Sequence, residues 1–129
     1  MAWHVPEIVL KDIEFTSLCQ HHLMPFSGVV HIGYLPQDGM VVGVSKLARL
    51  VDIFARRLQV QENMGEDISC ALLEHVSTLG IGVVIEATHC CLSCRGARKP
   101  DAVFVTSSMN GGFRDNPALR AEFLSIIGR

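Results

Sequence analysis

Residues that can bind a metal ion gather at two places in this sequence. The first is Cys19–His22, which reads Cys-Gln-His-His, and the second is His89–Cys91, which reads His-Cys-Cys. A mixed set of thiolate and imidazole ligands favours zinc, and three protein ligands with water in the fourth position make a catalytic site. Cys19 and His22 are three residues apart, so a tight turn can direct both side chains at one ion.

The simpler interpretation of any one of these residues is a buried cysteine or an incidental histidine, because free cysteine is commonly a small core residue. Two clusters in one short chain favour a shared zinc site instead. On this reasoning Cys90 and Cys91 are both candidates for the third ligand. A zinc finger is excluded because no second Cys-x-x-Cys pair exists. We assign Cys70 and Cys94 to packing, since each lacks a clear partner.

A second group of residues has the chemistry to bind a polyphosphate. Ser45, Lys46 and Arg49 place a hydroxyl, an ammonium and a guanidinium at or near an expected helix N-terminus, where backbone N–H groups and the helix dipole attract anions. Arg95, in a later polar loop, can complete the clamp. Solvated surface charges are an equally good interpretation of these residues. Glu62 fits a first-turn acid that satisfies a helix dipole.

The elements that must position these residues follow from hydrophobic periodicity. The first expected helix begins at the N-cap Ser45 and carries an apolar stripe from Leu47 to Leu58, while the second buries Ile68, Leu72 and Leu73. The expected elements are strands over Ile8–Phe15, Gly28–Leu35, Ile81–Thr88 and Ala102–Ser108, and helices from Ser45, over about Glu62–Val76, and from Pro117 to about Ile127 behind the N-cap Asn116.

This order of elements predicts an α+β fold in a single domain over residues 1–129, with a four-stranded antiparallel sheet and two helices on one face. Such a sheet has open edges, which are a liability unless neighbouring subunits pair with them. The chain is also 49% hydrophobic and only 19% charged. In a small domain this excess of apolar residues indicates surface buried between subunits, so we expect a homo-oligomer.

The composition also excludes several classes of protein. No apolar run is long enough to span a membrane, and the first residues lack the pattern of a signal peptide. A formal charge of −2 gives no overall attraction to nucleic acid or to an anionic membrane. An odd count of five cysteines argues against a disulfide framework, so we expect a cytoplasmic protein.

Several linked segments, in the same order and at matching separations, resemble GTP cyclohydrolase I. The resemblance runs from about Glu7 to Ile127 and does not include the helical N-terminal region of full-length members. The matching segments are Phe15–Phe26, Gly43–Arg49, Phe54–Glu62, Ile85–Cys91 and Arg95-Gly96. The resemblance implies a tunnelling-fold (T-fold) domain that assembles into a multi-subunit barrel, as a pentameric ring or two rings stacked as a decamer, with active sites between subunits.

The resemblance also implies a role for each candidate site residue. The zinc ligands are matched by Cys19, His22 and Cys91, and the choice of Cys91 over its neighbour rests only on the family's His-x-Cys spacing. The acid–base histidines are matched by His21 and His89. The triphosphate contacts are matched by Ser45, Lys46, Arg49 and Arg95, and we also group Ser45 with the catalytic residues. The residues that recognise the guanine edge are matched by Gln61 and Glu62.

The implied reaction is the zinc-dependent hydrolysis and rearrangement of GTP to 7,8-dihydroneopterin triphosphate, with release of formate. Zinc makes hydroxide available near neutral pH for attack on C8 of the purine, and a histidine titrating near pH 7 protonates N7. The imidazole ring then opens, a second hydrolysis releases formate, and the ribose carbons close a pterin ring. The carboxylate of Glu62 suits guanine because it accepts from both N1–H and the 2-amino group.

Two positions depart from the family's pattern and keep alternatives open. Gln20 stands where a glutamate is usual, and Asn63 stands where an arginine is usual. A specialised homologue that stops at a ring-opened formamidopyrimidine, or that takes another purine nucleotide, is therefore the first alternative. The second alternative is a non-catalytic, zinc-stabilised ring that binds nucleotides or a partner protein.

Overall fold

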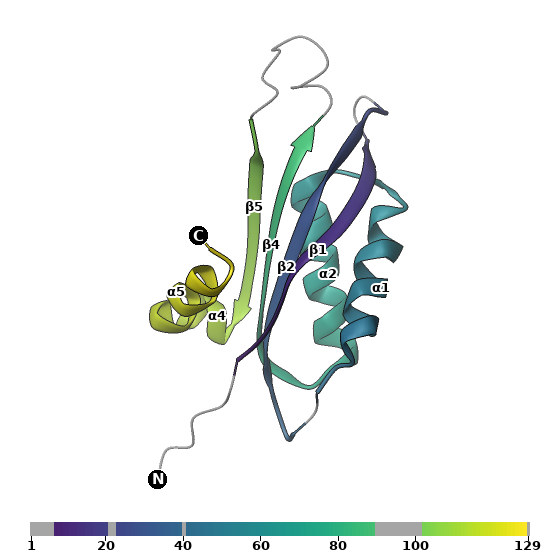
Figure 1. Ribbon diagram of the computed structural model, residues 1–129. Coiled ribbons are helices and arrows are strands. Elements are labelled where there is room, and N and C mark those ends of the chain that lie inside the picture. The colour runs from purple at the N-terminus through teal and green to yellow at the C-terminus, as the bar shows by residue number, and fades with distance from the viewer. Residues whose placement is uncertain (1–6, 21–22, 40, 90–101, 129) are drawn as a thin grey trace.

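The computed structural model describes residues 7–20, 23–39, 41–89 and 102–128, which form a sheet with helices on both of its faces (Figure 1). The strand order within the sheet is β3-β1-β2-β4-β5. The elements are β1 (Ile8–Cys19), β2 (Pro25–Pro36), α1 (Val44–Ala55), β3 (Leu58–Gln59), α2 (Gln61–His75), β4 (Thr78–His89), β5 (Phe104–Gly111), α4 (Gly112–Asp115) and α5 (Pro117–Ile126).

The four long strands pair antiparallel, as predicted, and the two-residue β3 adds a short parallel pairing with β1. β1 extends to Cys19, four residues beyond the expected end of the first strand. The residues between Phe15 and Cys19 still alternate between exposed and buried, and the ladder with β2 continues through Ser17 and Leu18. Cys19 is therefore the last residue of β1 and lies at the end of the sheet.

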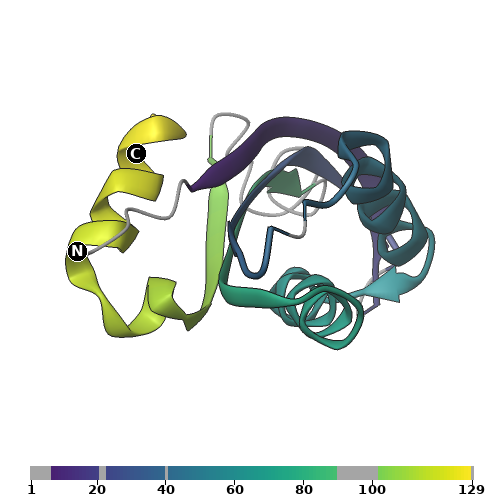
Figure 2. The same cartoon turned by 90° about the horizontal axis from the view of Figure 1, so that it is seen from below.

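α1 and α2 cover one face of the sheet (Figure 2). Val30 and Ile32 of β2 are fully buried in this core together with Leu47 and Val51 of α1 and Ile68 of α2. Alternation along the strand and helical spacing along α1 and α2 both place apolar side chains in this layer, because burial removes apolar surface from water. The apolar pattern therefore predicts this layer, in which α1 and α2 cover one face of the sheet.

Three expectations about the helices were wrong. α1 begins at Val44 with Gly43 as its N-cap, so Ser45 lies inside the first turn; extended Gly43 already accepts the N–H of Lys46 at 3.0 Å. Leu58 is not on the apolar stripe, because α1 ends at Ala55 and Leu58 is 53% exposed in β3. Leu73 is 44% exposed, since it follows Leu72 and the next position on a helix turns away from the buried face.

α5 packs on the opposite face of the sheet, a position that the sequence pattern left open (Figure 2). The ring of Phe123 lies against Gly33 of β2 and Gly82 of β4, which pair with each other. A Cβ at either glycine would come within 3 Å of that ring, so the two glycines open the space that it fills. The expected cap is confirmed, because Asn116 Oδ1 accepts from the backbone N–H groups of Ala118 and Leu119.

No helix within the described ranges is long and apolar enough to cross a membrane.

Candidate active site

The ends of several elements meet at one end of the sheet, which we call the Cys19 end (Figure 1, top). β1 finishes there at Cys19, β4 finishes at His89, and α2 begins at Gln61. The register runs from Ser17 of β1 to Phe26 of β2 and on to His89 of β4, so the two strands that end in candidate site residues are held apart by one strand only.

Cys19 is half-buried and begins a tight turn that leads back into β2. Its N–H donates to Met24 O and its carbonyl accepts from Leu23 N, both at 2.8 Å, while Gln20 N donates to Gln59 O of β3. Hydrogen bonds to both the N–H and the carbonyl group of Cys19 therefore fix its backbone. A half-buried thiol on a fixed turn is a suitable soft ligand for zinc.

The other predicted metal ligands, His22 and Cys91, lie outside the described residues, as do His21 and Arg95. Within the described residues no group of three metal-binding side chains occurs, which is expected when two of three ligands fall in the remaining segments. Cys91 follows His89 by two positions in the chain, and His22 follows Cys19 by three.

The imidazole ring of His89 is held from three sides. It stacks on Phe26 with ring centroids 4.6 Å apart and planes 7° apart, and it meets Phe104 edge to face at 5.5 Å. Its Nε2 lies 2.7 Å from Oε1 of Gln61. Burial lowers the pKa of His89, and the nearby carboxylate of Glu62 opposes this shift in part. The ring is therefore biased toward its neutral form and fixed in orientation.

Gln61 is the first residue of α2, and only 1% of it is exposed. Its Nε2 donates to Phe104 O at 2.9 Å, to Ile85 O at 3.2 Å and to Thr106 Oγ1 at 3.2 Å, while its Oε1 lies against His89. The sequence pattern did not indicate this network. A glutamine at the start of an amphipathic helix is normally exposed, and only the packing of α2 on β4 and β5 brings the amide to these carbonyl groups.

Glu62 and Asn63 are exposed in the first turn of α2. The first backbone N–H groups of an α-helix have no partner within the helix. In α2 the N-cap residue Val60 has no side-chain oxygen that could accept from them. Glu62 is close enough to His89 to affect its pKa. The Cys19 end thus gathers a thiol, an imidazole, a carboxylate and a set of N–H donors.

Ser45 and Lys46 lie at the other end of the sheet, which we call the Ser45 end. They are exposed in the first turn of α1, which no side chain caps, and Arg49 follows one turn later. α1 runs from this end toward the Cys19 end, and twelve residues rise about 18 Å. The structure therefore places Cys19, Gln61, Glu62 and His89 at the same end of the sheet, and it places Ser45 and Lys46 at the other end.

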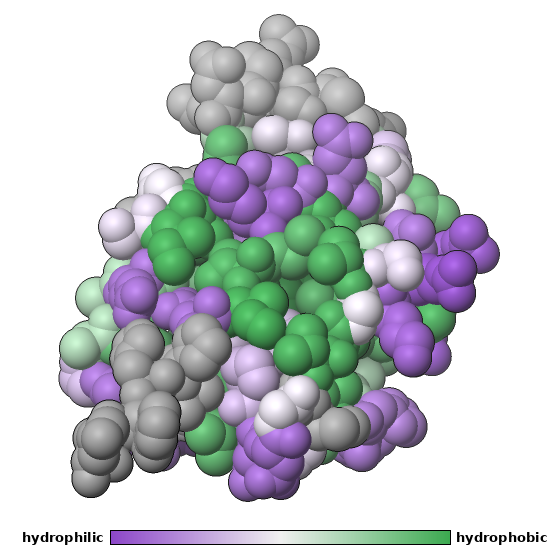
Figure 3. Space-filling view, turned by 60° about the horizontal axis from the view of Figure 1, so that its bottom comes forward, coloured by the Kyte–Doolittle hydropathy of each residue, from purple (hydrophilic) through white to green (hydrophobic). Residues whose placement is uncertain are grey.

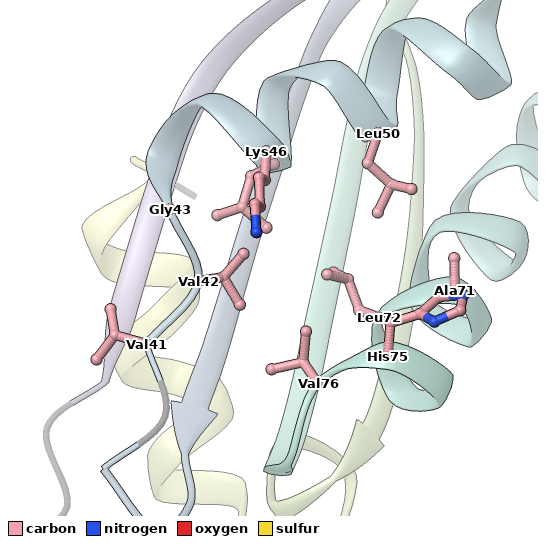
Figure 4. Close-up of a pocket in the computed structure, with 10 residues that line it drawn as sticks. Val41, Val42, Gly43, Lys46, Leu50, Ala71, Leu72, His75 and Val76 are labelled. Atoms are coloured by element: carbon pink, nitrogen blue, oxygen red, sulfur yellow. The ribbon is translucent and has the colours of Figure 1, made fainter.

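The Ser45 end is also largely apolar. A cavity of about 300 Å³ opens between the start of α1 and the end of α2 (Figure 4), and apolar side chains gather on this end of the molecule (Figure 3). Lys46 and His75 contribute the polar groups among valine and leucine walls. Val41 and Val44, beside the cavity, are 66% and 65% exposed. Apolar exposure on this scale is typical of a surface that another chain covers.

The fold is shared with known proteins of low sequence similarity. The archaeosine synthase QueF-Like in its apo form superposes with a TM-score of 0.68 at 18% identity, covering 84% of this chain and 98% of that one. Dihydroneopterin aldolase from Burkholderia thailendensis, in a structure bound to guanine, superposes with a TM-score of 0.56 at 14% identity, covering 83% of this chain and 91% of that one. The fold class is therefore the tunnelling fold, as predicted.

Sequence comparison narrows this class. The family model of GTP cyclohydrolase I matches residues 4–128. GTP cyclohydrolase 1 of Dehalococcoides mccartyi is 53% identical over 125 residues, which is 96% of this chain and 66% of that protein. The human GTP cyclohydrolase 1 is 51% identical over 124 residues, 96% of this chain and 49% of that protein. The chain belongs to the GTP cyclohydrolase I family, and it spans just under two thirds of the bacterial relative and about half of the human one.

Proposed function

We propose that this chain is the catalytic domain of an enzyme that converts GTP to 7,8-dihydroneopterin triphosphate and releases formate. One observation supports this most strongly: in a chain of this family, Cys19, Glu62 and His89 lie on three separate elements at the same end of the sheet. A thiol that binds metal, a base or acid near neutral pH, and a carboxylate for the guanine edge are the groups that the reaction requires.

Zinc is the metal that we propose for this site, with Cys19, His22 and Cys91 as its ligands. The half-buried thiol of Cys19 fits this choice. Two thiolates and one imidazole form a donor set that suits zinc better than magnesium or calcium. When bound, zinc supplies Lewis acidity that makes water a nucleophile near neutral pH.

The remaining chemistry falls to the side chains of the chain itself. His89, fixed by ring stacking and biased toward its neutral form, exchanges a proton with the purine ring, with His21 as the second acid–base group. Glu62 accepts from N1–H and the 2-amino group of guanine. The first-turn N–H groups of α2 offer donors beside it to the guanine carbonyl.

The triphosphate is bound, in this proposal, by Ser45, Lys46, Arg49 and Arg95. The exposed and uncapped N-terminus of α1 supports this role, because its N–H groups and dipole attract an anion that Lys46 then neutralises. Since Ser45 and Lys46 lie at the far end of α1 from His89, one GTP molecule is contacted by the Ser45 end of one subunit and the Cys19 end of another. The active site is then shared between subunits.

A ring-shaped homo-oligomer, a pentamer or a stacked decamer, supplies this arrangement. β5 forms one edge of the described sheet, and its Phe104 and Val105 are 40% and 43% exposed. An apolar, unpaired edge of this kind is stabilised when a strand of a neighbouring copy pairs with it. We propose that the protein works in the cytoplasm and binds neither nucleic acid nor membrane.

Product analysis on the purified protein tests the function. Incubation with GTP and zinc should yield a pterin that fluoresces after oxidation, one formate per turnover, and zinc bound to the same sample. Neither product appearing from zinc-loaded protein would reject the proposal.

The same experiment distinguishes the complete reaction from the first alternative, a specialised homologue, which the residues Gln20 and Asn63 favour. Gln20 is exposed beside Cys19 at the proposed metal site, where an amide in place of a carboxylate removes one negative charge. A homologue that stops after ring opening would give a product heavier than GTP by one water, with no formate. Bound nucleotide with no conversion would instead indicate the non-catalytic ring.

A further inference from the structure

Two buried polar side chains tie the C-terminal end of α1 to β1 and β3. The last carbonyl groups of a helix have no partner within it, so side chains from elsewhere can donate to them. Here Nε2 of Gln59 donates to Phe54 O at 2.8 Å, and Oγ of Ser17 donates to Arg57 O, just after α1, at 3.2 Å. Gln59 and Ser17 are 4% and 3% exposed, so both donors are shielded from water.

Gln59 also holds the turn that begins at Cys19. It belongs to β3, which has only two residues and pairs parallel with Leu18 and Cys19 of β1. The carbonyl of Gln59 accepts from Gln20 N, immediately after Cys19, at 2.8 Å. A strand of two residues makes few ladder bonds of its own. The side-chain bond of Gln59 to α1 therefore fixes β3 and, through β3, the backbone of Cys19 and Gln20.

We propose that Gln59, supported by Ser17, is a positioning residue that anchors the Cys19 turn on the end of α1, so that the backbone of Cys19 is already in place when a metal ion binds its thiol. The proposal rests on the proposed function, which makes Cys19 a zinc ligand, and it names the residues that preorganise this ligand. A ligand that the fold holds in place loses less conformational freedom when it binds its metal. Outer groups that orient a ligand contribute about 10- to 100-fold to metal affinity.

A pair of matched substitutions in the full chain tests the proposal. Gln59→Met keeps the length of the side chain and removes its hydrogen bond to Phe54 O. Thr78→Val is the control, because Thr78 Oγ1 also donates to a backbone carbonyl, that of Leu35 at 2.8 Å, but at the Ser45 end of the sheet. Each substitution removes a side-chain donor from a backbone carbonyl, so both should lower the Tm of the zinc-free protein by a similar amount.

The two variants should differ in zinc affinity. The dissociation constant for zinc, measured by competition with a chelator, should rise about 10-fold in Gln59→Met and stay within about twofold in Thr78→Val. Ser17→Ala removes the second bond to the end of α1 and should raise the dissociation constant by a smaller factor, since β3 keeps its own anchor in Gln59. Equal zinc affinity in Gln59→Met and Thr78→Val would overturn the proposal.

Hydrogen exchange on the zinc-free protein tests the anchoring without the metal. The amide N–H groups of Gln20 and Leu23, which donate to Gln59 O and Cys19 O, should be protected in the unsubstituted protein and should exchange faster in Gln59→Met. Exchange of both amides at the rate of an unfolded chain in the unsubstituted protein would overturn the proposal, whether or not any variant folds. Absence of bound zinc from the unsubstituted protein would reject the proposed metal site alone, and the exchange rates would still show whether Gln59 holds the turn.

Discussion

The two ends of the sheet differ in how their functional groups are held. At the Cys19 end, His89 is stacked, hydrogen-bonded and half-buried, and its partner Gln61 is fully buried. At the Ser45 end, Ser45 and Lys46 stand exposed on an uncapped helix N-terminus. Proton transfer and metal binding require fixed geometry, whereas attraction of a polyphosphate by a helix dipole and a long cationic side chain tolerates motion.

The difference indicates what a single chain of this fold can and cannot do. In the proposed function, each chain contributes one half of a site, with the metal and acid–base groups, at one end, and another half, with the phosphate-binding groups, at the other end, separated by the length of α1. In the proposed function these halves act on the same substrate only when they belong to different copies.

The largest effect is expected from the proposed zinc ligands. Cys91→Ala should lose both bound zinc and activity, because removal of one of three protein ligands leaves too weak a site. Cys90→Ala should keep both and serves as the control. Metal analysis and pterin formation on the two purified variants check this. The opposite result would show that Cys90, not Cys91, is the ligand.

Mixing subunits tests whether the two ends belong to one site. Lys46→Ala and His89→Ala should each be inactive alone. After the two proteins are unfolded and refolded together, about a quarter of the shared sites would combine an intact Ser45 end with an intact Cys19 end, so about a quarter of the activity should return.

The control for this mixture uses two variants that are altered at the same end. Cys19→Ala mixed with His89→Ala should recover nothing, since no combination of these chains gives an intact Cys19 end. Recovery in the control, or no recovery in the first mixture despite mixed oligomers, would contradict a site shared in the proposed way.

A smaller effect is expected when the guanine contact is altered and the fold is left intact. Glu62→Gln removes the charge from an exposed carboxylate in the first turn of α2, and the ratio of kcat/KM for GTP over ATP should fall about 10- to 100-fold. Glu66→Gln is the matched control, because it removes a charge one turn later and still accepts from Ser108. Equal discrimination in both variants would exclude Glu62 as the guanine contact.

The sequence predicted the α+β class, the antiparallel sheet, the covering helices and the cap at Asn116, because these depend on local periodicity and local capping chemistry. It did not predict which face α5 would cover, since the space for Phe123 is made by Gly33 and Gly82 on two strands far apart in the chain. The N-cap of α1 was predicted at Ser45 because serine is common at that position. The N-cap is Gly43 instead, because the extended backbone of Gly43 precedes the first helical residue, Val44.

Within the candidate site, the sequence identified residue types but not their supporting contacts. Cys19, Glu62 and His89 were indicated by chemistry and by resemblance, and their meeting at one end of the sheet follows from strand register that only the fold provides. The buried network of Gln61 joins it to residues 24 to 45 positions away in the chain. Likewise, no pattern in the sequence reveals that Ser45 and Lys46 lie at the far end from the residues with which they are proposed to act.

The smallest effect is expected from a carboxylate that belongs to neither half-site. Both oxygens of Glu7 are buried without a hydrogen-bond partner, and desolvation, with Glu122 nearby, raises the pKa of this group. A raised pKa in the folded state means that the protonated form favours folding below the usual pKa of 4.5, and that this contribution is lost as the pH rises through the folded-state pKa.

Glu7→Gln should therefore have a slightly higher Tm than the unsubstituted protein at pH 7, because a neutral amide of the same shape avoids the burial of a charge. The difference should shrink as the pH falls below 4.5, where Glu7 becomes protonated in the unfolded state as well as in the folded one. Thermal unfolding across this pH range checks the sign, with Glu14→Gln, an exposed carboxylate on β1, as the control. Activity on GTP should not change, since Glu7 lies immediately before β1, away from the Cys19 end. A lowered Tm at pH 7 would contradict the prediction, because it would show that the charged form of Glu7 stabilises the fold.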